Sequence, residues 1–537
     1  MKKNLLTLLL LFTIVSPSYN QTDFMFDDTW ANWTLRLTRA YQGIPQRKVP
    51  GRTMGIIVPA DTREDLIPLS AFGYEAFSVS PAPIVIILMD APDGYTFDGL
   101  AIPGVDVIET SIGRFSISES VRTILLGGNI PVTIDPNLFQ ADIPRTLLLQ
   151  LAQLKHVLRK IPTTMRILPV YVRFSDANSQ VKDIAPYIAE KLKDVGIEND
   201  VQFIIATNLS RSTSPEKLIQ ADAPLLNAIR NLDVDAFLQS RVSSDTGIPS
   251  DALLLGMLTV RTLGADHSEI FAYAHSGQLV LTKDKSAPLS YFSAGFASAP
   301  VIKPRLTHVD REQMIEIFNE LLRADILSIT RQTCASALDA TAAKPSSLSG
   351  HKPAKQKWPV YVSLYDSSGN LAGQAGSHVA IGALEESIRN FAVEAVRQAQ
   401  PTLTKTNFGS YIVEVAIPYG FLKVSYPEEL ISHLNGAIVY NKLKTAASHP
   451  DVWRTVPDSH LILGALCYKL GLKPWSYSFS NAKIESFRLL AFNEKEPFQD
   501  LGALSRKSKK KKTPKDDESL DSGGGGAIGG STSPFGF

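Results

Sequence analysis

Apolar runs and amphipathic stretches alternate along the first half of the chain. The pattern is centred on Ile84–Asp90, an apolar run that ends abruptly in an Asp/Pro/Gly cluster. A run of this length, bounded by turn residues, is typical of a strand buried on both faces of a sheet. Further strands are predicted over residues 54–59, 165–174, 201–208, 269–274 and 289–297, and helices over 145–160, 184–195, 216–230 and 250–263. Strands alternating with helices predict an α/β domain with a largely parallel sheet.

The second half has a different order of elements, which predicts an α+β domain. Helices are predicted over 308–327, 381–399 and 457–471, a hairpin over 358–365 and 371–375, and strands over 410–424 and 484–493. The predicted division is a signal peptide at 1–20, an irregular lead-in at 21–53, the α/β domain at 54–300, a helical connection at 301–338, a linker at 339–357, the α+β domain at 358–496 and a tail at 497–537. The linker is inferred from its Ala, Lys, Pro, Ser and Gly content.

Composition excludes some classes of function. The 537 residues are 44% apolar and carry a formal net charge of +1, so packed cores are expected and nucleic acid is not an expected partner. The tail is Lys-rich, then acidic, then Gly-rich, and cannot bury a core, which predicts disorder. Its basic run Lys507–Lys512 indicates a solvated segment or, alternatively, a contact with a polyanion.

The N-terminus has the layout of a secretory signal peptide of the bacterial type. Lys2 and Lys3 precede the apolar run Leu5–Val15, which is too short to span a bilayer, and Ser16–Gln21 is small and polar. A buried N-terminal helix is the alternative. We expect an exported protein, periplasmic or secreted, without a transmembrane segment after cleavage.

Only two cysteines are present, Cys334 and Cys467. An exported compartment permits a disulfide between them. The apolar helical surroundings of Cys467 favour a buried free thiol instead. Two cysteines cannot form a thiolate metal cage by themselves.

Short segments of the first half follow one another in a recognisable order. They are Gly55–Pro59, Ile87–Leu88, Gly99–Ala101, Glu109–Gly113, Ile167–Val170, Gly247–Pro249, Ser276–Gly277 and Ser293–Ala297. In this order, residues 54 to about 298 resemble the Memo family, whose fold is related to that of class III extradiol dioxygenases. The resemblance implies a metal site built from histidines at strand ends.

Those histidines are absent at the matching positions. The family's histidine motifs read Pro59–Arg63, Met89–Asp93 and Ala206–Arg211 in this chain, and its E-H-S-x-E and Cys-Gly segments fall on Asp142–Thr146 and Thr246–Gly247. The histidine positions hold Ala60, Pro92 or Asp93, and Arg211. Neither alanine, proline nor arginine offers a lone pair to a transition metal. We therefore expect the iron or copper site to be lost and no cofactor to be bound.

The second half contains three further segments, Pro359–Leu364, Gly369–Gly373 and Lys469–Trp475. They resemble the AMMECR-type domain, and the whole chain resembles a fusion of proteins A and B of the AmmeMemoRadiSam system. The family's L-R-G-C-I-G stretch reads Leu371–Gly376, with Ala372 for the Arg and Gln374 for the Cys. Gly373 and Gly376 are kept, so we expect a turn there and take Gly373, Gln374 and Gly376 as candidate site positions.

Polar residues nevertheless follow the predicted strand ends of the first half. The candidate pocket residues are Asp61, Arg63, Asp90, Asp93, Asn208, Arg211, Thr246 and His275. Their carboxylates could hold a hard divalent cation through oxygen. The favoured interpretation is that Asp90 and Asp93 cap a turn. Asp61 with Arg63, and Asp93 with Arg211, could equally be ion pairs, and His275 could be a structural histidine.

These observations support three hypotheses of function. The favoured one is an exported, non-catalytic binding or scaffold protein with a degenerate metal site, whose partner is a small polar ligand or another protein. The second is a hydrolase or other enzyme that uses the carboxylate-lined pocket with a hard cation. The third, by analogy, is a partner subunit of a radical SAM-linked system. Phosphate-loop, H-E-x-x-H and G-x-S-x-G motifs are absent from the sequence.

Overall fold

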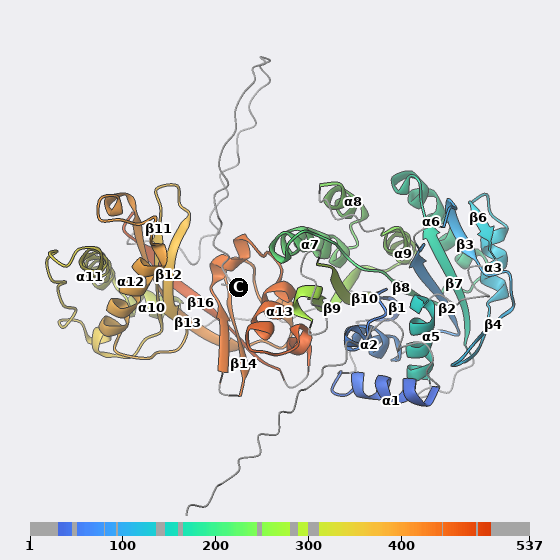
Figure 1. The fold of residues 1–537 in the computed structure, drawn as a ribbon, viewed down its shortest axis with the longest axis horizontal. Coiled ribbons are helices and arrows are strands. Elements are labelled where there is room, and N and C mark those ends of the chain that lie inside the picture. The colour runs from blue at the N-terminus through green and yellow to red at the C-terminus, as the bar shows by residue number, and fades with distance from the viewer. Residues whose placement is uncertain are drawn as a thin grey trace, which may run out of the picture.

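The computed structural model places two parts side by side along the longest axis of the molecule (Figure 1). It describes residues 30–45, 51–79, 81–92, 95–135, 145–158, 165–243, 250–279, 288–298, 311–442, 444–479 and 482–495. The predicted signal peptide, Asp93, Thr246 and the tail lie outside the described residues.

The N-terminal part is built on an eight-stranded mixed sheet. In spatial order its strands are β6 (Val132–Ile134), β3 (Gly99–Ile102), β7 (Arg166–Arg173), β2 (Ile84–Asp90), β8 (Val201–Ala206), β1 (Thr53–Val58), β10 (Ser290–Ala297) and β9 (His267–His275). The four central strands, β7, β2, β8 and β1, are parallel. Strands β3 and β10 run antiparallel to this centre, and β9 is antiparallel to β10.

The predicted largely parallel sheet is confirmed for the three pairs of the centre and for the outer pair of β6 with β3, while the pairs β3–β7, β1–β10 and β10–β9 are antiparallel. Strands β9 and β10 are consecutive in the chain and pair directly, which makes them antiparallel. Strand β3 has only four residues and inserts between β6 and β7, so local periodicity does not reveal it.

Helices cover both faces of this sheet (Figure 1). One face carries α1 (Trp30–Ala40), α2 (Ile67–Phe77) and α5 (Arg145–Leu158), and the other α6 (Ala177–Asp194), α7 (Pro215–Arg230), α8 (Val234–Ser243) and α9 (Asp251–Thr262). The smaller elements are η1 (Glu64–Leu66), the hairpin β4 (Val107–Thr110) and β5 (Gly113–Ser116), α3 (Glu119–Leu126) and η2 (Ser276–Gln278). The predicted irregular lead-in thus contains a helix, α1, because Trp33 and Leu37 bury one face of it.

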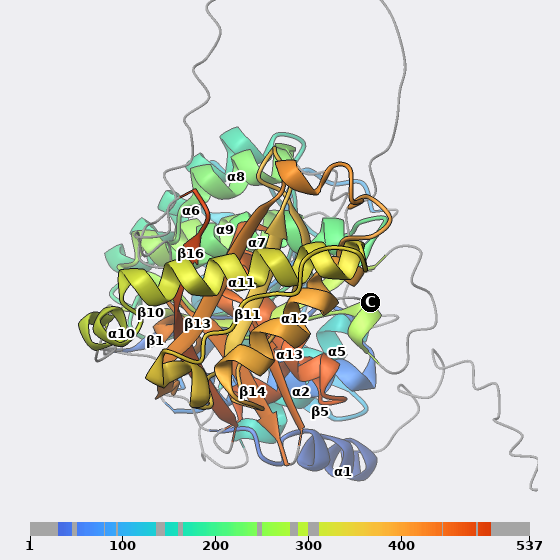
Figure 2. The ribbon, with the colours of Figure 1, turned by 90° about the vertical axis from the view of Figure 1, so that its left-hand side faces the viewer.

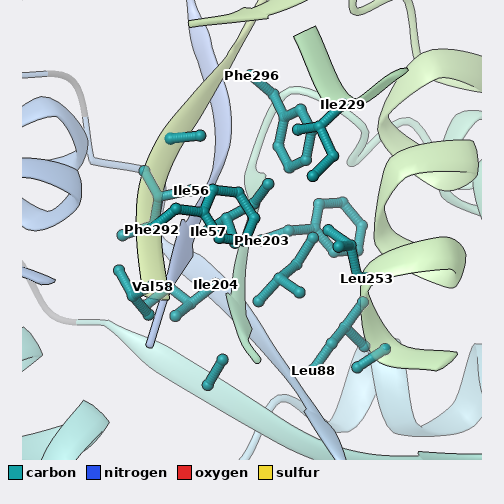
Figure 3. Close-up of a cluster of buried hydrophobic side chains, with 14 of the residues drawn as sticks. Ile56, Ile57, Val58, Leu88, Phe203, Ile204, Ile229, Leu253, Phe292 and Phe296 are labelled. Carbon is teal, nitrogen blue, oxygen red and sulfur yellow. The ribbon is translucent and has the colours of Figure 1, made fainter. Parts of the chain in front are cut away.

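Apolar side chains of α7 and α9 close over one face of the central strands. Figure 3 shows Leu253 of α9 beside Phe203 and Leu88, and Ile229 of α7 beside Phe296, all at most 2% exposed. Burial on both faces explains why Ile84–Asp90 is apolar without alternation. A cavity of about 10 Å³ lies in this core and is lined almost entirely by apolar side chains. It is too small and too apolar to hold a ligand or an ordered water.

The C-terminal part is built on a six-stranded antiparallel sheet. Its strands, in spatial order, are β12 (Leu371–Ser377), β11 (Val360–Tyr365), β13 (Ile412–Lys423), β16 (Lys483–Asn493), β14 (Gly436–Asn441) and β15 (Lys444–Ser448). Helices α11 (Glu320–Leu338) and α12 (Leu384–Ala399) lie across one face (Figure 2). The remaining elements are α10 (Arg311–Ile317), α13 (Ser459–Lys469), η3 (Lys352–Lys355), η4 (Phe408–Ser410), η5 (Pro427–Glu429), η6 (Pro450–Arg454) and η7 (Pro474–Ser478). His378 Nε2 lies 3.2 Å from Thr445 Oγ1 of β15, so the sheet curls until its two edges approach.

Residues 339–357, predicted as a linker, pack against this C-terminal part. Leu348 is 1% exposed. Its N–H donates to Glu385 of α12 at 2.9 Å, and the Ser346 N–H donates to Gln332 of α11 at 2.7 Å. The composition is that of a spacer, but the buried side chain of Leu348 and two hydrogen bonds from backbone N–H groups to helix side chains hold the segment in place.

The helical stretch predicted over 308–327 is two helices within the described residues, α10 and α11. Asn319 lies between them and caps α11, since its side chain accepts from the Leu322 N–H at 3.0 Å. A capping asparagine of this kind starts a new helix rather than continuing the old one.

The two parts share a continuous apolar core along strand β9. Helix α13 and η7 pack against β9 (Figure 1). Trp475 of η7 is 1% exposed and lies in one cluster with Phe72 and Phe271. The Ser478 hydroxyl donates to the Phe271 carbonyl at 2.5 Å. The C-terminal part therefore covers the edge strand of the larger sheet.

Candidate functional site

The carboxyl ends of the parallel strands place most candidate residues along one edge of the large sheet. Asp90 ends β2, Asn208 follows β8, and Asp61 follows β1, and these strands are neighbours in that order. His275 ends β9 at the same edge, two strands beyond β1. Adjacent strands are about 4.8 Å apart, so His275 is roughly 20 Å from Asp90 across the sheet.

The Asp90 carboxylate, at the end of β2, accepts two hydrogen bonds. Its Oδ2 accepts from the Thr207 hydroxyl at 2.8 Å and its Oδ1 from the Ala252 N–H at 3.0 Å. Ala252 is the second residue of α9, so Asp90, at the end of strand β2, caps a helix that is distant in the sequence. Burial raises the pKa of Asp90 to about 7, and the charge of Asp251 adds to this. The predicted capping role is thus present, but at a helix rather than at a turn.

Asp251 lies beside Asp90 and is itself engaged. It accepts from the Phe174 N–H at 2.9 Å and lies 3.4 Å from the guanidinium of Arg241. Sequence reasoning missed Thr207, Asp251 and Arg241. The only usable signal was Ser250–Asp251, which is typical of a helix start.

Asp61 and Arg63 form the ion pair that the sequence suggested. Arg63 Nε lies 3.5 Å from Asp61 Oδ2, which also accepts from the Tyr291 hydroxyl at 3.0 Å. The Arg63 guanidinium lies over the Tyr291 ring, 5.1 Å from its centroid. Asp65 Oδ1 is 3.7 Å from Arg63 Nε. Burial raises the pKa of Asp65, although the positive charges of Arg63 and Lys473 act to lower it.

The other candidates of this edge are not drawn together. Asn208 Oδ1 accepts from the Ala60 N–H at 3.2 Å, which closes the end of β1 against β8. Arg211 is exposed to solvent and pairs through its backbone with Leu289. The pair considered for Asp93 and Arg211 involves a residue outside the described part of the chain.

His275 is a buried histidine at the far end of the edge. It is 2% exposed, and burial lowers its pKa to about 4, so its ring is neutral at pH 7. His267 starts the same strand, roughly 26 Å away at strand geometry. The two histidines cannot share a metal, as the spacing predicts.

The predicted turn at Gly373, Gln374 and Gly376 is wrong, because all three lie within strand β12. A Cβ on Gly373 would lie 2.2 Å from the Ala395 carbonyl oxygen of α12, and one on Gly376 would lie 2.3 Å from the Tyr361 ring. These glycines allow a close approach of helix and ring to the strand. They do not provide an unusual backbone angle.

A second polar cluster lies on the face of β12, β11 and β13 that is turned away from α12. The Tyr365 hydroxyl is 2.8 Å from Asp451 Oδ2 and 3.2 Å from Glu414 Oε1. Gln374 Nε2 donates to Ser363 Oγ at 2.9 Å. One hydroxyl hydrogen can serve only one of the two carboxylates at a time. Sequence reasoning missed this cluster because Asp451 is 86 residues from Tyr365.

The described residues could also contain metal-ion groups, membrane-spanning helices or reactive cysteines. In the ranges given above, no three His, Cys, Asp or Glu side chains are grouped so that they could hold a metal ion. Within the same ranges, every helix is too short or too polar to cross a bilayer. Cys334 and Cys467 are free and buried, and burial raises the pKa of each thiol to about 12.

Comparison with known proteins relates the C-terminal part to one family. Residues 327–492 match the AMMECR1 family, starting inside α11 and upstream of the predicted start at residue 358. No curated protein matches the chain significantly.

Similar solved structures include two uncharacterized proteins. One is PH0010 from Pyrococcus horikoshii, at 19% identity over 32% of this chain and 91% of that chain, with a TM-score of 0.28. The other is JW3007 from Escherichia coli K12, at 14% identity over 45% of this chain and 99% of that chain, with a TM-score of 0.30. At these TM-scores neither likeness bears on function.

The resemblance of the N-terminal part to the Memo family therefore stays a prediction. The mixed α/β architecture of that part and the α+β architecture of the second are observed. Residues 327–492 of this chain are an AMMECR1 domain.

Proposed function

We propose that this protein is an exported, non-catalytic binding or scaffold protein. In this proposal the N-terminal domain has a Memo-like fold with a degenerate metal site and supports the AMMECR1 domain. The observation that carries the proposal is the double engagement of Asp90, whose two carboxylate oxygens accept from Thr207 and Ala252. This carboxylate of the candidate site already has a structural role.

Neighbouring positions support the same proposal. Ala60 offers no ligand atom in its side chain. Asn208 holds the end of β1, and Asp61 is engaged by Tyr291 and Arg63. Binding a cation at this edge would require these groups to give up hydrogen bonds, and each bond to a charged group contributes about 1.5–3 kcal/mol.

Elemental analysis of the purified protein tests the proposal. We expect no stoichiometric iron or copper. The comparison set is Asp90→Asn, Asp61→Asn and the control Asp194→Asn, a carboxylate on the surface of α6 that pairs with Lys191. About one iron or copper per chain, lost in the first two variants and kept in the control, would refute the proposal.

The pairing of Asp90 with Asp251 favours one alternative, an enzyme that uses a hard cation at this edge. Calorimetric titration with Mg²⁺, Ca²⁺ and Mn²⁺ distinguishes the two. Saturable binding that Asp90→Asn abolishes would support the enzyme, and its absence would support the binding protein. A role as a subunit of a radical SAM-linked system rests on the family resemblance alone.

Export has its own test. Mass spectrometry of protein from the native cell should find a mature N-terminus between residues 17 and 23, because the cleavage region follows the apolar run Leu5–Val15. A protein that keeps Met1 in the cytosol would contradict export.

A further inference from the structure

One arginine of the second half is buried without a partner among the described residues. Arg323 of α11 is 3% exposed, and its Nε is buried without a hydrogen-bond acceptor. Within the ranges that the structure describes, its guanidinium forms no ion pair. Arg331, about two turns further along the same helix, is more exposed, yet it pairs with Glu494 and donates to two backbone carbonyls. Of these two arginines, the more deeply buried one is the one without a charge partner.

Arg323 lies on the face of α11 that packs on the six-stranded sheet. Leu327 and Thr330 follow it at helical spacing and are buried too. Figure 2 shows α11 lying across the strands of this sheet. A long helical side chain leans toward the N-terminus of its helix, so the guanidinium is directed back toward the α10–α11 junction. The N-terminal end of α11 carries a partial positive charge and therefore does not neutralise the arginine.

The sheet presents two further buried donors beneath this junction. Antiparallel pairing places Arg488 of β16 opposite Tyr419 of β13. The register of β11 with β13, continued toward the start of β11, places Trp358 on the other side of Tyr419. The ring centroids of Trp358 and Phe318, which follows α10, are 5.0 Å apart. Arg488 Nε and Trp358 Nε1 are both buried without an acceptor, so one row across three strands faces the junction with two N–H donors that have no partner.

The nearby carboxylates do not compensate these charges. Glu312 and Glu316 of α10 and Glu320 of α11 are exposed. In the described part of the chain, none of them pairs with Arg323 or Arg488. A guanidinium keeps its charge at every accessible pH. Water can accept from its N–H groups but cannot neutralise it, and burying an unpaired charge is costly. A negatively charged group at the junction would compensate both arginines.

We propose that the α10–α11 junction is a binding site for an oxyanion, the phosphate or carboxylate group of a small molecule, held by Arg323, Arg488 and the indole N–H of Trp358. The planar fork of a guanidinium matches two oxygens of either group. Phe318 and Tyr419 belong to the apolar cluster around the junction, and an apolar surrounding strengthens hydrogen bonds to charged groups. The site belongs to the second sheet, and it does not depend on the function proposed above for the edge of the large sheet.

Calorimetric titration of the full-length protein tests the site. The probes are inorganic phosphate and acetate, added at constant ionic strength to a chloride buffer so that general screening does not change. We expect saturable binding of one anion per chain. Tighter binding of phosphate would identify a phosphate group as the natural ligand group, and tighter binding of acetate would identify a carboxylate.

Three variants assign the binding to the junction. Arg323→Met keeps a long side chain but removes the charge, and it should weaken binding of the preferred probe about tenfold or more, because charge-assisted hydrogen bonds are the strong ones. Arg323→Lys keeps the charge without the fork and should bind with an affinity between those of Arg323→Met and the parent. Arg397→Met is the control, since it removes an exposed arginine of α12 that pairs with Glu394, and it should bind like the parent.

Urea denaturation gives a second readout, which an arginine with a purely structural role would not produce. In chloride buffer Arg323→Met should be at least as stable as the parent, because the parent buries an unpaired charge at this position. With the preferred probe at saturation the order should reverse, since an anion that binds only the folded chain stabilises it. The site would be overturned by the absence of saturable binding of both probes, by equal affinities of Arg323→Met and the parent, by an equal loss in Arg397→Met, or by an Arg323→Met variant that is already the less stable protein in chloride.

Discussion

Asp90, at the end of the central strand, shows which contacts of a residue can be predicted from the local sequence. The apolar run Ile84–Asp90 predicts both the strand and a capping carboxylate after it. Ala252, whose N–H Asp90 accepts in the helix that it caps, lies 162 residues later in the chain. Local pattern contains no information on a contact of that range, so the residue could be predicted and its partner Ala252 could not.

Two substitutions of Asp90 separate the contribution of helix capping to stability from that of the buried charge. Asp90→Ala removes both acceptors and should lower the free energy of unfolding by about 1 kcal/mol, the usual cost of a lost helix cap. Asp90→Asn keeps one acceptor oxygen and carries no charge. It should be at least as stable as the parent at pH 8, because there the buried parent carboxyl, whose pKa is raised to about 7, is ionised. Urea titrations across pH values measure both effects.

The sign of this pH dependence can be checked independently. The pKa of Asp90 is raised to about 7 in the folded chain, so its contribution is complete below about pH 4 and is lost as the pH rises through 7. Asp90→Asn should flatten the stability profile between these values. An unchanged profile in the variant would show that Asp90 is not buried in its described position.

Gly373 tests the close approach of α12 to β12. Gly373→Ala places a methyl group 2.2 Å from the Ala395 carbonyl oxygen, and backbone of a packed helix cannot move aside easily. We expect a loss of about 2 kcal/mol or more in the free energy of unfolding. The matched control is Gly350→Ala, whose added Cβ meets nothing within 4 Å. Equal melting temperatures for the two variants would contradict this packing.

At the scale of whole elements, long apolar or periodic runs were predictable and short ones were not. Strand β2 has the predicted bounds, and α5 has the predicted start and reaches Leu158, the last described residue of that range. Helices α1 and α2 and strands β3 and β6 are among the elements that were missed. Strands β3 and β6 have four and three residues, too few to show a period. Helix α2 is buried on nearly all sides and therefore has no polar face that would reveal a helical period. The direction of β3 depends on its pairing with β7, which periodicity does not determine.

The sequence predicted residues 301–338 as a connection between the two domains. The AMMECR1 match begins at residue 327, inside α11, so this helix belongs to the second domain. Arg331 of α11 pairs with Glu494 and donates to the Phe408 and Tyr411 carbonyls at 3.0 and 2.6 Å. Its guanidinium also lies over the Phe408 ring. These contacts tie α11 to the strands of the domain.

Arg331→Ala should therefore destabilise the AMMECR1 domain by about 2 kcal/mol or more, because hydrogen bonds to charged groups contribute about 1.5–3 kcal/mol each. Arg397→Ala is the control. It removes an exposed arginine of α12 that pairs with Glu394, and exposed pairs contribute at most about 1 kcal/mol. Chemical denaturation of both variants measures the difference, and similar losses would argue against an integral α11.

At the scale of the whole molecule, the sequence predicted two domains joined by a linker, and in the structure an apolar core runs from one domain into the other. The core around β9 continues into α13 and η7. The residues on each side of this interface, Trp475 on one and Phe271 on the other, are apolar like those of an ordinary domain core. Nothing in a single sequence distinguishes a side chain buried within a domain from one buried between two.

Cleavage between the two parts tests this joint core. A protease site inserted between Ser298, which follows β10, and Arg311, which starts α10, should after cleavage leave two fragments that separate in SDS but elute together in native gel filtration. Trp475→Ala removes a buried side chain whose loss costs about 3–5 kcal/mol, and the nicked variant should dissociate. Separate elution of the parent fragments would show that the two parts are independent.

The cover that η7 places on strand β9 also has a consequence for biosynthesis. Phe271 and Ser478, whose hydrogen bond closes this edge, are 207 residues apart. At about 5–20 residues per second, the ribosome needs roughly 10–40 s to make the intervening chain. During that interval the edge strand of the large sheet is open to pairing with other nascent chains. A chain that ends at residue 298, just after β10, keeps this edge open permanently, and light scattering should detect its self-association at concentrations where the full-length protein stays dispersed.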